Sequence, residues 1–332
     1  MLRLRPFDLL QPLKLEEVLE ALRTHAPNAR LIAGGTDLLP NLKLGHGRAE
    51  VLVSLRQVAE LNEITLDDQG LRIGAGVRLH DLAQDPDVLQ RAPILAESAA
   101  RAASPQIRRM GTLGGNLLLD TRCRYINQSE LFREALGGCL KSHGQECHVV
   151  PGGQTCVSAL SADTVPALIV LGATVEIAGP SGRRSLPVAD LYVTDGTQHT
   201  AVGRDEVLMA VRVPASPVSD AQPGLAHRFA TRKWAVRKSI DFPLVAIALR
   251  LDLDGEVTRG GVLAVAVLGP RPRVLDLAAF AGVPIDDALA DRVGQLAFDR
   301  CRPLPNVPYD AAYRRERLAV EVRRAVRSLA AD

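Results

Sequence analysis

The stretch from Gly111 to Asp163 constrains this chain most. It opens with Gly111-Thr112-Leu113-Gly114-Gly115-Asn116, and paired glycines let a backbone approach a ligand closely. It closes at Asp163, just before an apolar segment. The residues between them include four of the five cysteines of the chain: Cys123, Cys139, Cys147 and Cys156. We therefore predict a ligand-contacting turn and a ligand-contacting carboxylate, separated by an inserted loop that holds a metal centre.

The spacing of the four clustered cysteines leaves three kinds of site open. Successive cysteines are separated by 15, 7 and 8 residues, unlike the close pairs of structural zinc sites or the compact runs of ferredoxins. An iron–sulfur cubane can still take its sulfurs from separate turns of a glycine-rich loop, near the positive side chains of Arg122, Arg124, Lys141 and His148. Zinc with a ligand from His143 or His148, and reduced core cysteines, are the alternatives. Cys301 stands apart and is predicted to be a free thiol.

Composition excludes several classes of function. The chain has 332 residues, 47% of them hydrophobic, which is enough for more than one core. The formal charge of +2 gives no electrostatic reason to expect binding to nucleic acid or to an anionic membrane. The C-terminal cluster Arg314, Arg315 and Arg317 alternates with glutamates and is interpreted as a solvated helix face. No signal peptide is evident, and the apolar run 165–177 is too short to span a bilayer, so a cytoplasmic protein is predicted.

Hydrophobic periodicity predicts alternating helices and strands, the pattern of an α/β or α+β fold. Predicted helices cover residues 15–24, 38–44, 79–82, 94–103, 286–296 and 311–329, and predicted strands cover 31–33, 51–53, 71–73, 167–177, 206–213, 244–252 and 261–268. Residues 112–117 are predicted to be a turn. The Pro/Ser/Gly-rich stretch 214–224 is predicted as the domain boundary, giving domains at 1–218 and 222–330 with an insertion at 120–160.

Another glycine turn occurs earlier, at Ala33-Gly34-Gly35-Thr36-Asp37-Leu38, between a predicted strand and a predicted helix, and is called the first turn here; the turn that opens at Gly111 is the second. It is neither a Rossmann fingerprint nor a Walker A loop, but such a turn can present main-chain N–H groups to a pyrophosphate. Two turns of this kind favour a long dinucleotide, whereas an ordinary strand-to-helix turn is the plain alternative. Gly74-Ala75-Gly76 is interpreted as a strand without a ligand role. No catalytic constellation is found, so the sequence predicts cofactor sites rather than a substrate-transforming site.

The two glycine turns, followed by Asp163-x-x-Pro166-Ala167-Leu168, resemble the FAD-binding medium subunits of molybdenum hydroxylases, the xanthine dehydrogenase and carbon monoxide dehydrogenase family. The resemblance covers nearly the whole chain. It implies a two-part FAD-binding domain of the vanillyl-alcohol-oxidase (PCMH) type, then a small C-terminal α+β domain like that of carbon monoxide dehydrogenase flavoproteins. Arg237 and Lys233 resemble a basic segment near the flavin. The residues carried over as FAD-binding are Ile32, Ala33, Gly34, Gly35, Thr36, Asp37, Leu38, Thr112, Gly114, Gly115, Asn116, Asp163 and Lys233.

The cysteine-containing insertion resembles that of the β subunits of 4-hydroxybenzoyl-CoA reductases, which carry an additional [4Fe–4S] cluster there. The resemblance implies that Cys123, Cys139, Cys147 and Cys156 ligate this cluster. It implies an electron-transfer subunit for reductive dehydroxylation in anaerobic aromatic degradation, with a ferredoxin-like donor. The partners would be a large molybdopterin subunit and a small subunit with two [2Fe–2S] clusters, in a dimer of heterotrimers. The FAD subunit of an oxidative molybdenum hydroxylase is the alternative.

Overall fold

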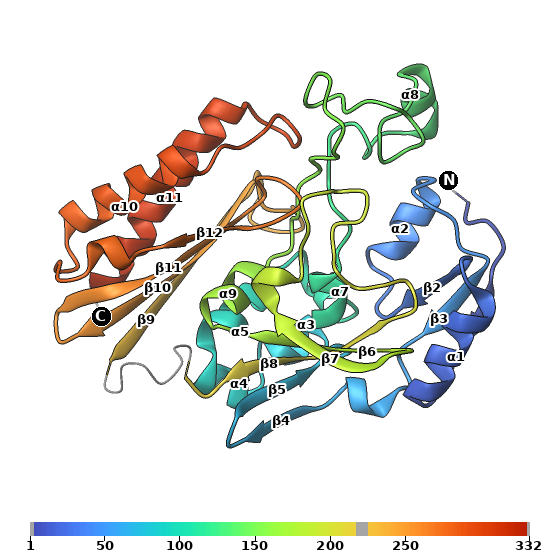
Figure 1. The fold of residues 1–332 in the computed structure, drawn as a ribbon, viewed down its shortest axis with the longest axis horizontal. Coiled ribbons are helices and arrows are strands. Elements are labelled where there is room, and N and C mark those ends of the chain that lie inside the picture. Colours follow the sequence, from blue (N-terminus) through green and yellow to red (C-terminus); the bar gives the residue numbers. More distant parts are fainter. Residues whose placement is uncertain (1–2, 217–224, 331–332) are drawn as a thin grey trace.

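The N-terminal part of the molecule is built on a small parallel sheet. A computed structural model describes residues 3–216 and 225–330 (Figure 1). The sheet has the order β1-β3-β2, from β1 (Asp8–Leu10), β3 (Val51–Ser54) and β2 (Ala29–Ile32). Helix α1 (Leu15–His25) follows from apolar residues at helical spacing, and it buries Leu15, Val18 and Leu22 against the sheet. Helix α2 (Leu38–Lys43) follows the first glycine turn.

A five-stranded antiparallel sheet forms the second part. Its order is β4-β5-β8-β6-β7, from strands β4 (Ile64–Asp67), β5 (Gly70–Gly74), β8 (Val207–Pro214), β6 (Thr174–Gly179) and β7 (Gly182–Pro187). Most of the helices of this part share one apolar core with the sheet. These are α3 (Leu79–Leu82), α4 (Pro86–Arg91), α5 (Pro93–Ala100), α7 (Leu113–Leu117) and α9 (Val165–Val170), whereas α6 (Pro105–Arg108), between α5 and α7, has no buried residue.

The C-terminal part is a four-stranded antiparallel sheet covered by two helices (Figure 1). The order is β12-β11-β10-β9, from β12 (Arg273–Asp276), β11 (Val257–Ala266), β10 (Val245–Asp254) and β9 (Ala226–Trp234). Helices α10 (Asp287–Arg300) and α11 (Ala311–Ala330) pack on each other, and α11 also packs on β9 and β10. Helix α9 contacts β10 and β11, so this sheet also contacts the preceding part of the chain. The predicted mixed architecture is confirmed.

The insertion projects at the top of the view in Figure 1 and contains one helix, α8 (Glu130–Ala135). Its two ends are joined by an antiparallel bridge, in which Arg122 and Ala159 exchange backbone hydrogen bonds of 2.8 and 2.7 Å. The backbone N–H of Arg124 donates to the carbonyl of Asn306 at 2.7 Å. The two ends of the insertion are therefore bonded to each other, and the first end is also bonded to the C-terminal part.

One of the predicted strands is partly a helix. Residues 167–177 were expected to be one strand, but α9 (Val165–Val170) precedes β6. A continuous apolar run has no period that separates a buried helix from a buried strand, and here Pro166 opens a helix that ends before Gly172, whose φ is +67°. Most of the predicted boundary at 214–224 lies outside the described residues.

The interpretation of Arg314 as part of a solvated face is wrong. Its side chain is fully buried, and its guanidinium donates to the carbonyls of Leu244, Leu304 and Val267. Burial lowers the pKa of Arg314 to about 10. Five N–H donors in a planar fork can satisfy several carbonyls that the end of a sheet leaves unpaired, so this arginine joins chain segments instead of facing water.

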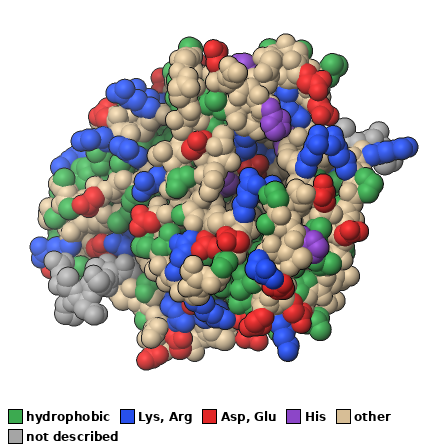
Figure 2. Space-filling view, turned by 45° about the vertical axis from the view of Figure 1, so that its right-hand side comes forward, with side chains coloured by type: hydrophobic (Ala, Val, Ile, Leu, Met, Phe, Trp, Pro, Cys, Tyr) green, Lys and Arg blue, Asp and Glu red, His purple; other side chains and the backbone are tan. Residues whose placement is uncertain are grey.

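Lysine and arginine side chains are interspersed with acidic ones over the face drawn in Figure 2. In the described part of the chain, none of the helices combines the length and the apolar character that crossing a membrane requires. Cys301 is a free cysteine, as predicted; it is fully buried, and burial raises the pKa of its thiol to about 11.

Candidate FAD cleft and cysteine cavity

The first glycine turn contacts the second through its backbone. Gly35 has a φ of +70°, a left-handed conformation that glycine adopts without strain. A Cβ on Gly34 would lie only 1.9 Å from the carbonyl oxygen of Met110, the residue that precedes the second turn sequence. Thr36 is exposed, and its Oγ1 would be 3.3 Å from a Cβ on Gly111. The two turns can lie this close together because Gly34 and Gly111, which have no side chains, occupy the points of contact.

Most of the second turn sequence forms a short helix, α7 (Leu113–Leu117), so the prediction of a turn over residues 112–117 is wrong. Thr112 is its N-cap, with Oγ1 accepting from the backbone N–H of Gly115 at 3.1 Å. Gly114 packs against Ala75, where a Cβ would lie 2.8 Å from the Ala75 Cβ. The hydroxyl cap starts a helix that two glycines would otherwise disfavour. The position of Gly114 is set by its contact with Ala75, the residue that directly follows β5.

Asn116 joins this turn sequence to the segment that follows the insertion. Its side chain is buried, and Oδ1 accepts from the backbone N–H of Thr164 at 3.1 Å and from the Thr164 hydroxyl at 2.7 Å. Thr164 directly follows Asp163 in the chain. The structure therefore joins the second turn to the segment of the predicted flavin-contacting Asp, across the whole insertion.

A large cleft runs along both turns, with about 1280 Å³ of space not filled by protein atoms, part of it open to solvent. Of the predicted FAD residues, Ala33, Gly34 and Thr112 line it. Sequence analysis missed the other lining residues, and in particular it assigned Gly76 no ligand role. Those residues are Leu55, Arg56, Asn62, Ile64, Gly76, Val77, Arg78, Asp81, Asp85 and Met110. The available signal was a third small-residue stretch followed by a helix, at 74–79.

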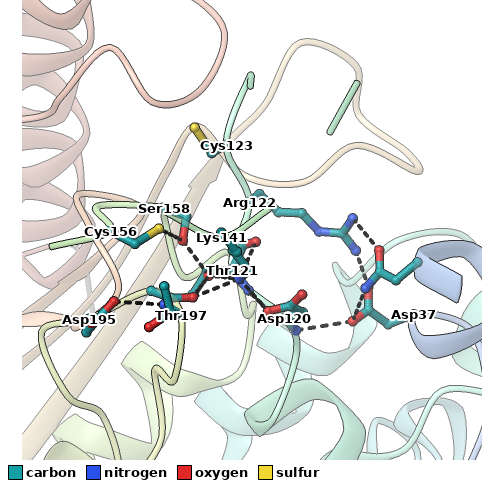
Figure 3. A network of polar contacts seen from close by, with 12 residues as sticks. Asp37, Asp120, Thr121, Arg122, Cys123, Lys141, Cys156, Ser158, Asp195 and Thr197 are labelled. Atoms are coloured by element: carbon teal, nitrogen blue, oxygen red, sulfur yellow. Dashed lines mark hydrogen bonds and ion pairs between the residues drawn. The ribbon is translucent and has the colours of Figure 1, made fainter. Parts of the chain in front are cut away.

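Six further residues of the predicted FAD set do not line the cleft: Ile32, which precedes the first turn, and Gly35, Thr36, Leu38, Gly114 and Gly115, which belong to the two turn sequences. Asp37 belongs to a polar network (Figure 3). Its carboxylate pairs with Arg122, and it accepts from the backbone N–H of Asp120 at 3.1 Å and the side-chain amide of Asn41 at 3.2 Å. Burial raises the pKa of Asp37, and the nearby Arg122 opposes that shift. Asp37 therefore connects the first turn to the start of the insertion.

Asp163 and Lys233 form a buried ion pair between the segment that follows the insertion and β9. The Lys233 Nζ lies 2.8 Å from Asp163 Oδ1 and donates to the carbonyl of Arg101 at 2.9 Å. Only 8% of the Asp163 side chain is exposed, and this burial raises the pKa of its carboxyl to about 6, against the opposing effect of Lys233. Arg237, by contrast, is mostly exposed and pairs with Asp241.

The four insertion cysteines converge on one cavity. Cys123, Cys139, Cys147 and Cys156 all line a space of about 300 Å³ that is not filled by protein atoms and is partly open. Lys141 and His148 line it too, whereas the predicted cations Arg122 and Arg124 do not. Among the described residues, no three His, Cys, Asp or Glu side chains are arranged to hold a single metal ion. The four cysteines therefore surround a common space, but no three of their sulfurs are placed to bind one metal ion together.

Hydroxyl groups lie against two of these sulfurs. Ser142 Oγ is 3.5 Å from Cys139 Sγ, and Ser158 Oγ is 3.2 Å from Cys156 Sγ. Burial raises the pKa of the Cys123 thiol, and the nearby Cys156 and Cys139 add to that shift. Without a bound cation, a thiol in this position stays protonated.

Comparison with known proteins relates this fold to flavin-binding subunits. Residues 5–216 match the model of a family described as the FAD binding domain in molybdopterin dehydrogenase. The FAD-binding subunit PaoB of an aldehyde oxidoreductase of Escherichia coli K12 is 36% identical over 248 residues, which cover 71% of this chain and 75% of that protein. The carbon monoxide dehydrogenase medium chain of Afipia carboxidovorans is 27% identical over 96% of this chain and 95% of its own.

The solved structures agree with this relation. A chain of quinoline 2-oxidoreductase from Pseudomonas putida 86 superposes with a TM-score of 0.79 at 26% identity, covering 99% of this chain and 98% of the other. A chain of a Cu,Mo-CO dehydrogenase superposes with a TM-score of 0.77 at 26% identity, covering 99% of both chains. The likeness therefore extends over the FAD-binding part and the C-terminal part together.

Proposed function

Because this chain belongs to the family of FAD-binding medium subunits of molybdenum hydroxylases, the xanthine dehydrogenase and carbon monoxide dehydrogenase family, we propose that it carries electrons through FAD and a [4Fe–4S] cluster within a molybdenum enzyme complex. The observation that carries the proposal is the convergence of all four insertion cysteines on one cavity. When bound, the flavin would exchange one or two electrons and the cluster one, so the chain contributes binding and electrostatics.

The cleft supports FAD held by its pyrophosphate at the two glycine turns. Gly34 brings the turns into contact, and Thr112 and Gly76 line the same space. Main-chain N–H groups of such turns are suitable donors to phosphate oxygens. Arg56 and Arg78 are exposed on the cleft wall, where their charge would offset that of the pyrophosphate. Asp163, Lys233 and the polar network of Asp37 would hold the shape of the site from outside the cleft.

The arrangement of the cysteines favours a multi-iron cluster over zinc. Four sulfurs at 2.3 Å from one tetrahedral zinc lie about 3.8 Å from each other. No such tight group occurs in the described residues, although all four cysteines line one cavity. In a cubane each cysteine binds a different iron at a separate corner, so the sulfurs stand farther apart. Reduced core cysteines would not need a common cavity.

Metal analysis tests the cluster directly. About four irons and matching acid-labile sulfide per chain are expected, and Cys147→Ser should lower both while FAD stays bound. Cys301→Ala, which removes the buried thiol of the C-terminal part, serves as the matched control and should keep the iron. One zinc per chain without iron would refute the cluster.

Two reactions are candidates for the complex, and a separate observation favours each. Oxidation of an aldehyde on a partner subunit is favoured by the 36% identity to an aldehyde oxidoreductase FAD-binding subunit. Reductive dehydroxylation of 4-hydroxybenzoyl-CoA, with electrons from a ferredoxin-like donor, is favoured by the resemblance of the cysteine-containing insertion. In both cases we propose a large molybdopterin subunit and a small subunit with two [2Fe–2S] clusters as partners, in a cytoplasmic dimer of heterotrimers.

An assay of the purified complex decides between the reactions. Aldehyde-dependent reduction of an artificial acceptor is expected for the first, and turnover of 4-hydroxybenzoyl-CoA with reduced ferredoxin for the second. If ferredoxin is the donor, Cys147→Ser should abolish ferredoxin-driven turnover and keep activity with a dye that reaches the flavin directly. Activity with neither substrate would remove both candidates and leave the electron-transfer role.

A further inference from the structure

A chain of buried hydrogen bonds ends on the sulfur of Cys156 (Figure 3). Ser158 Oγ lies 3.2 Å from Cys156 Sγ and 2.6 Å from Thr121 Oγ1. Thr121 Oγ1 in turn accepts from Lys141 Nζ at 2.5 Å. Thr121 and Ser158 are almost completely buried, and only 11% of the Lys141 side chain is exposed. These contacts join residues from both ends and the middle of the insertion.

The two ends of this chain set the direction of every hydrogen bond in it. An ammonium group has only donors, and a sulfur bound to iron has no proton and can only accept. Each hydroxyl has a single proton. Lys141 therefore donates to Thr121, Thr121 donates to Ser158, and Ser158 donates to the sulfur. The carbonyl of Gly196 is the other acceptor within reach of Thr121, at 3.1 Å, but the Ser158 oxygen is nearer.

The remaining donors of Lys141 are also occupied. Its Nζ donates to Asp120 Oδ1 at 2.6 Å and to the carbonyl of Gly196 at 2.8 Å, which with Thr121 accounts for three protons. Gly196 also donates its N–H to the carbonyl of Cys156 at 2.8 Å. A Cβ on Gly196 would lie 2.1 Å from Ser158 Oγ and 2.9 Å from Cys156 Sγ. Because Gly196 has no side chain, its backbone can pack close to both atoms and keeps the Ser158 hydroxyl next to the Cys156 sulfur.

We propose that Ser158, oriented by Thr121 and Lys141, donates a hydrogen bond to the Cys156 sulfur and raises the reduction potential of the cluster. This inference rests on the cluster proposed above. Reduction adds negative charge to the iron and sulfur atoms, and a donor on a ligating sulfur stabilises that charge. The effect is strengthened because the chain is buried and begins at a cation, so that each hydrogen bond polarises the next. Ser158, Thr121 and Lys141 are positioning residues.

The test is a redox titration of the purified complex, followed by the electron paramagnetic resonance signal of the reduced cluster. Ser158→Ala should keep its iron and lower the equilibrium constant for cluster reduction about tenfold, which corresponds to about 59 mV for one electron. Thr121→Val should shift the potential in the same direction, and Thr121→Ser should restore it. Ser129→Ala is the matched control, because the Ser129 hydroxyl lies in the insertion but accepts from the N–H of Phe132 instead of contacting a sulfur.

A double variant distinguishes an effect that Thr121 exerts through Ser158 from a general loss of order in the insertion. If Thr121 acts through Ser158, Thr121→Val should add no shift to that of Ser158→Ala. Should Ser158→Ala fail to assemble, the pair Thr121→Val and Thr121→Ser decides by the same titration. If the variants keep their full iron content and the reduction potential of the cluster does not change, the proposed role of the hydrogen-bond chain is wrong, but the proposed cluster is not affected. A wild-type complex without iron in this chain overturns both.

Discussion

At the scale of single residues, Gly34 determines whether the two glycine turns can touch. Any side chain there would meet the Met110 carbonyl, which is backbone and cannot rotate away. Gly34→Ala should therefore separate the turns, lower flavin occupancy and destabilise the fold by about 1–3 kcal/mol. The ratio of flavin to protein absorbance and a urea titration measure both effects. Gly269→Ala, at a position with no neighbour within 4 Å of the added Cβ, should change neither.

Asp163 predicts a pH dependence of stability. Burial raises the pKa of its carboxyl from 3.8 to about 6, so between these values the folded state binds more proton than the unfolded state. The contribution of Asp163 to the free energy of unfolding should then decrease as pH rises from about 4 to about 6, by on the order of 3 kcal/mol.

Asparagine cannot titrate, so the difference in unfolding free energy between wild type and Asp163→Asn isolates this contribution. Denaturant titrations between pH 4 and pH 7 measure it. A difference that stays constant over this range would show that the carboxyl titrates in the folded state as it does in water.

At the scale of elements, α8 is attached to the FAD-binding part by one buried arginine. Arg133 donates to His46 Nε2 at 2.9 Å and to the carbonyls of Leu44 and Ile126 at 2.7 and 3.3 Å. Arg133→Met removes these donors while keeping the apolar stem. Amide hydrogen exchange in residues 126–140 should accelerate about 10- to 100-fold, since hydrogen bonds of a charged group contribute about 1.5–3 kcal/mol.

Arg124→Met is the matched control for α8, because Arg124 is exposed and anchors the insertion through its backbone N–H. Its exchange rates should equal those of the wild type. Equal rates in Arg133→Met as well would mean that packing of the insertion core, around Ile126 and Val149, is sufficient to hold α8.

At the scale of the whole molecule, Asn306 joins the insertion to the C-terminal sheet. It is fully buried, and its amide donates to the carbonyls of Val157 and Leu268 at 2.7 and 3.1 Å. Asn306→Ala leaves both carbonyls without this donor and should lower the free energy of unfolding by about 2–4 kcal/mol. Thermal unfolding measures the loss. Asn28→Ala, which removes an exposed hydrogen bond to Glu50, should have an effect within about 0.5 kcal/mol.

Local chemistry was readable from the sequence wherever a property belongs to a few neighbouring residues. The periodicity of Leu15, Val18 and Leu22 predicted α1, and the glycine pair predicted the turn at Gly34, whereas the glycines at 114 and 115 lie in the helix α7. The cysteine cluster predicted a metal centre that is still a proposal, and the order of the motifs predicted the family. Helix α9 was missed because an apolar run that is buried on all sides carries no period.

The spatial relations between distant segments were decided only by the tertiary structure. Gly76 lines the cleft, Arg314 is buried, and Lys141, Thr121 and Ser158 form one chain, although nothing in their neighbours along the sequence indicates it. Each of these positions depends on a contact between segments far apart in the sequence, such as the bridge between residues 122 and 159. The sequence by itself specified which groups could bind or donate. Which donor faces which acceptor followed only from packing, because burial and hydrogen-bond geometry are properties of the folded chain.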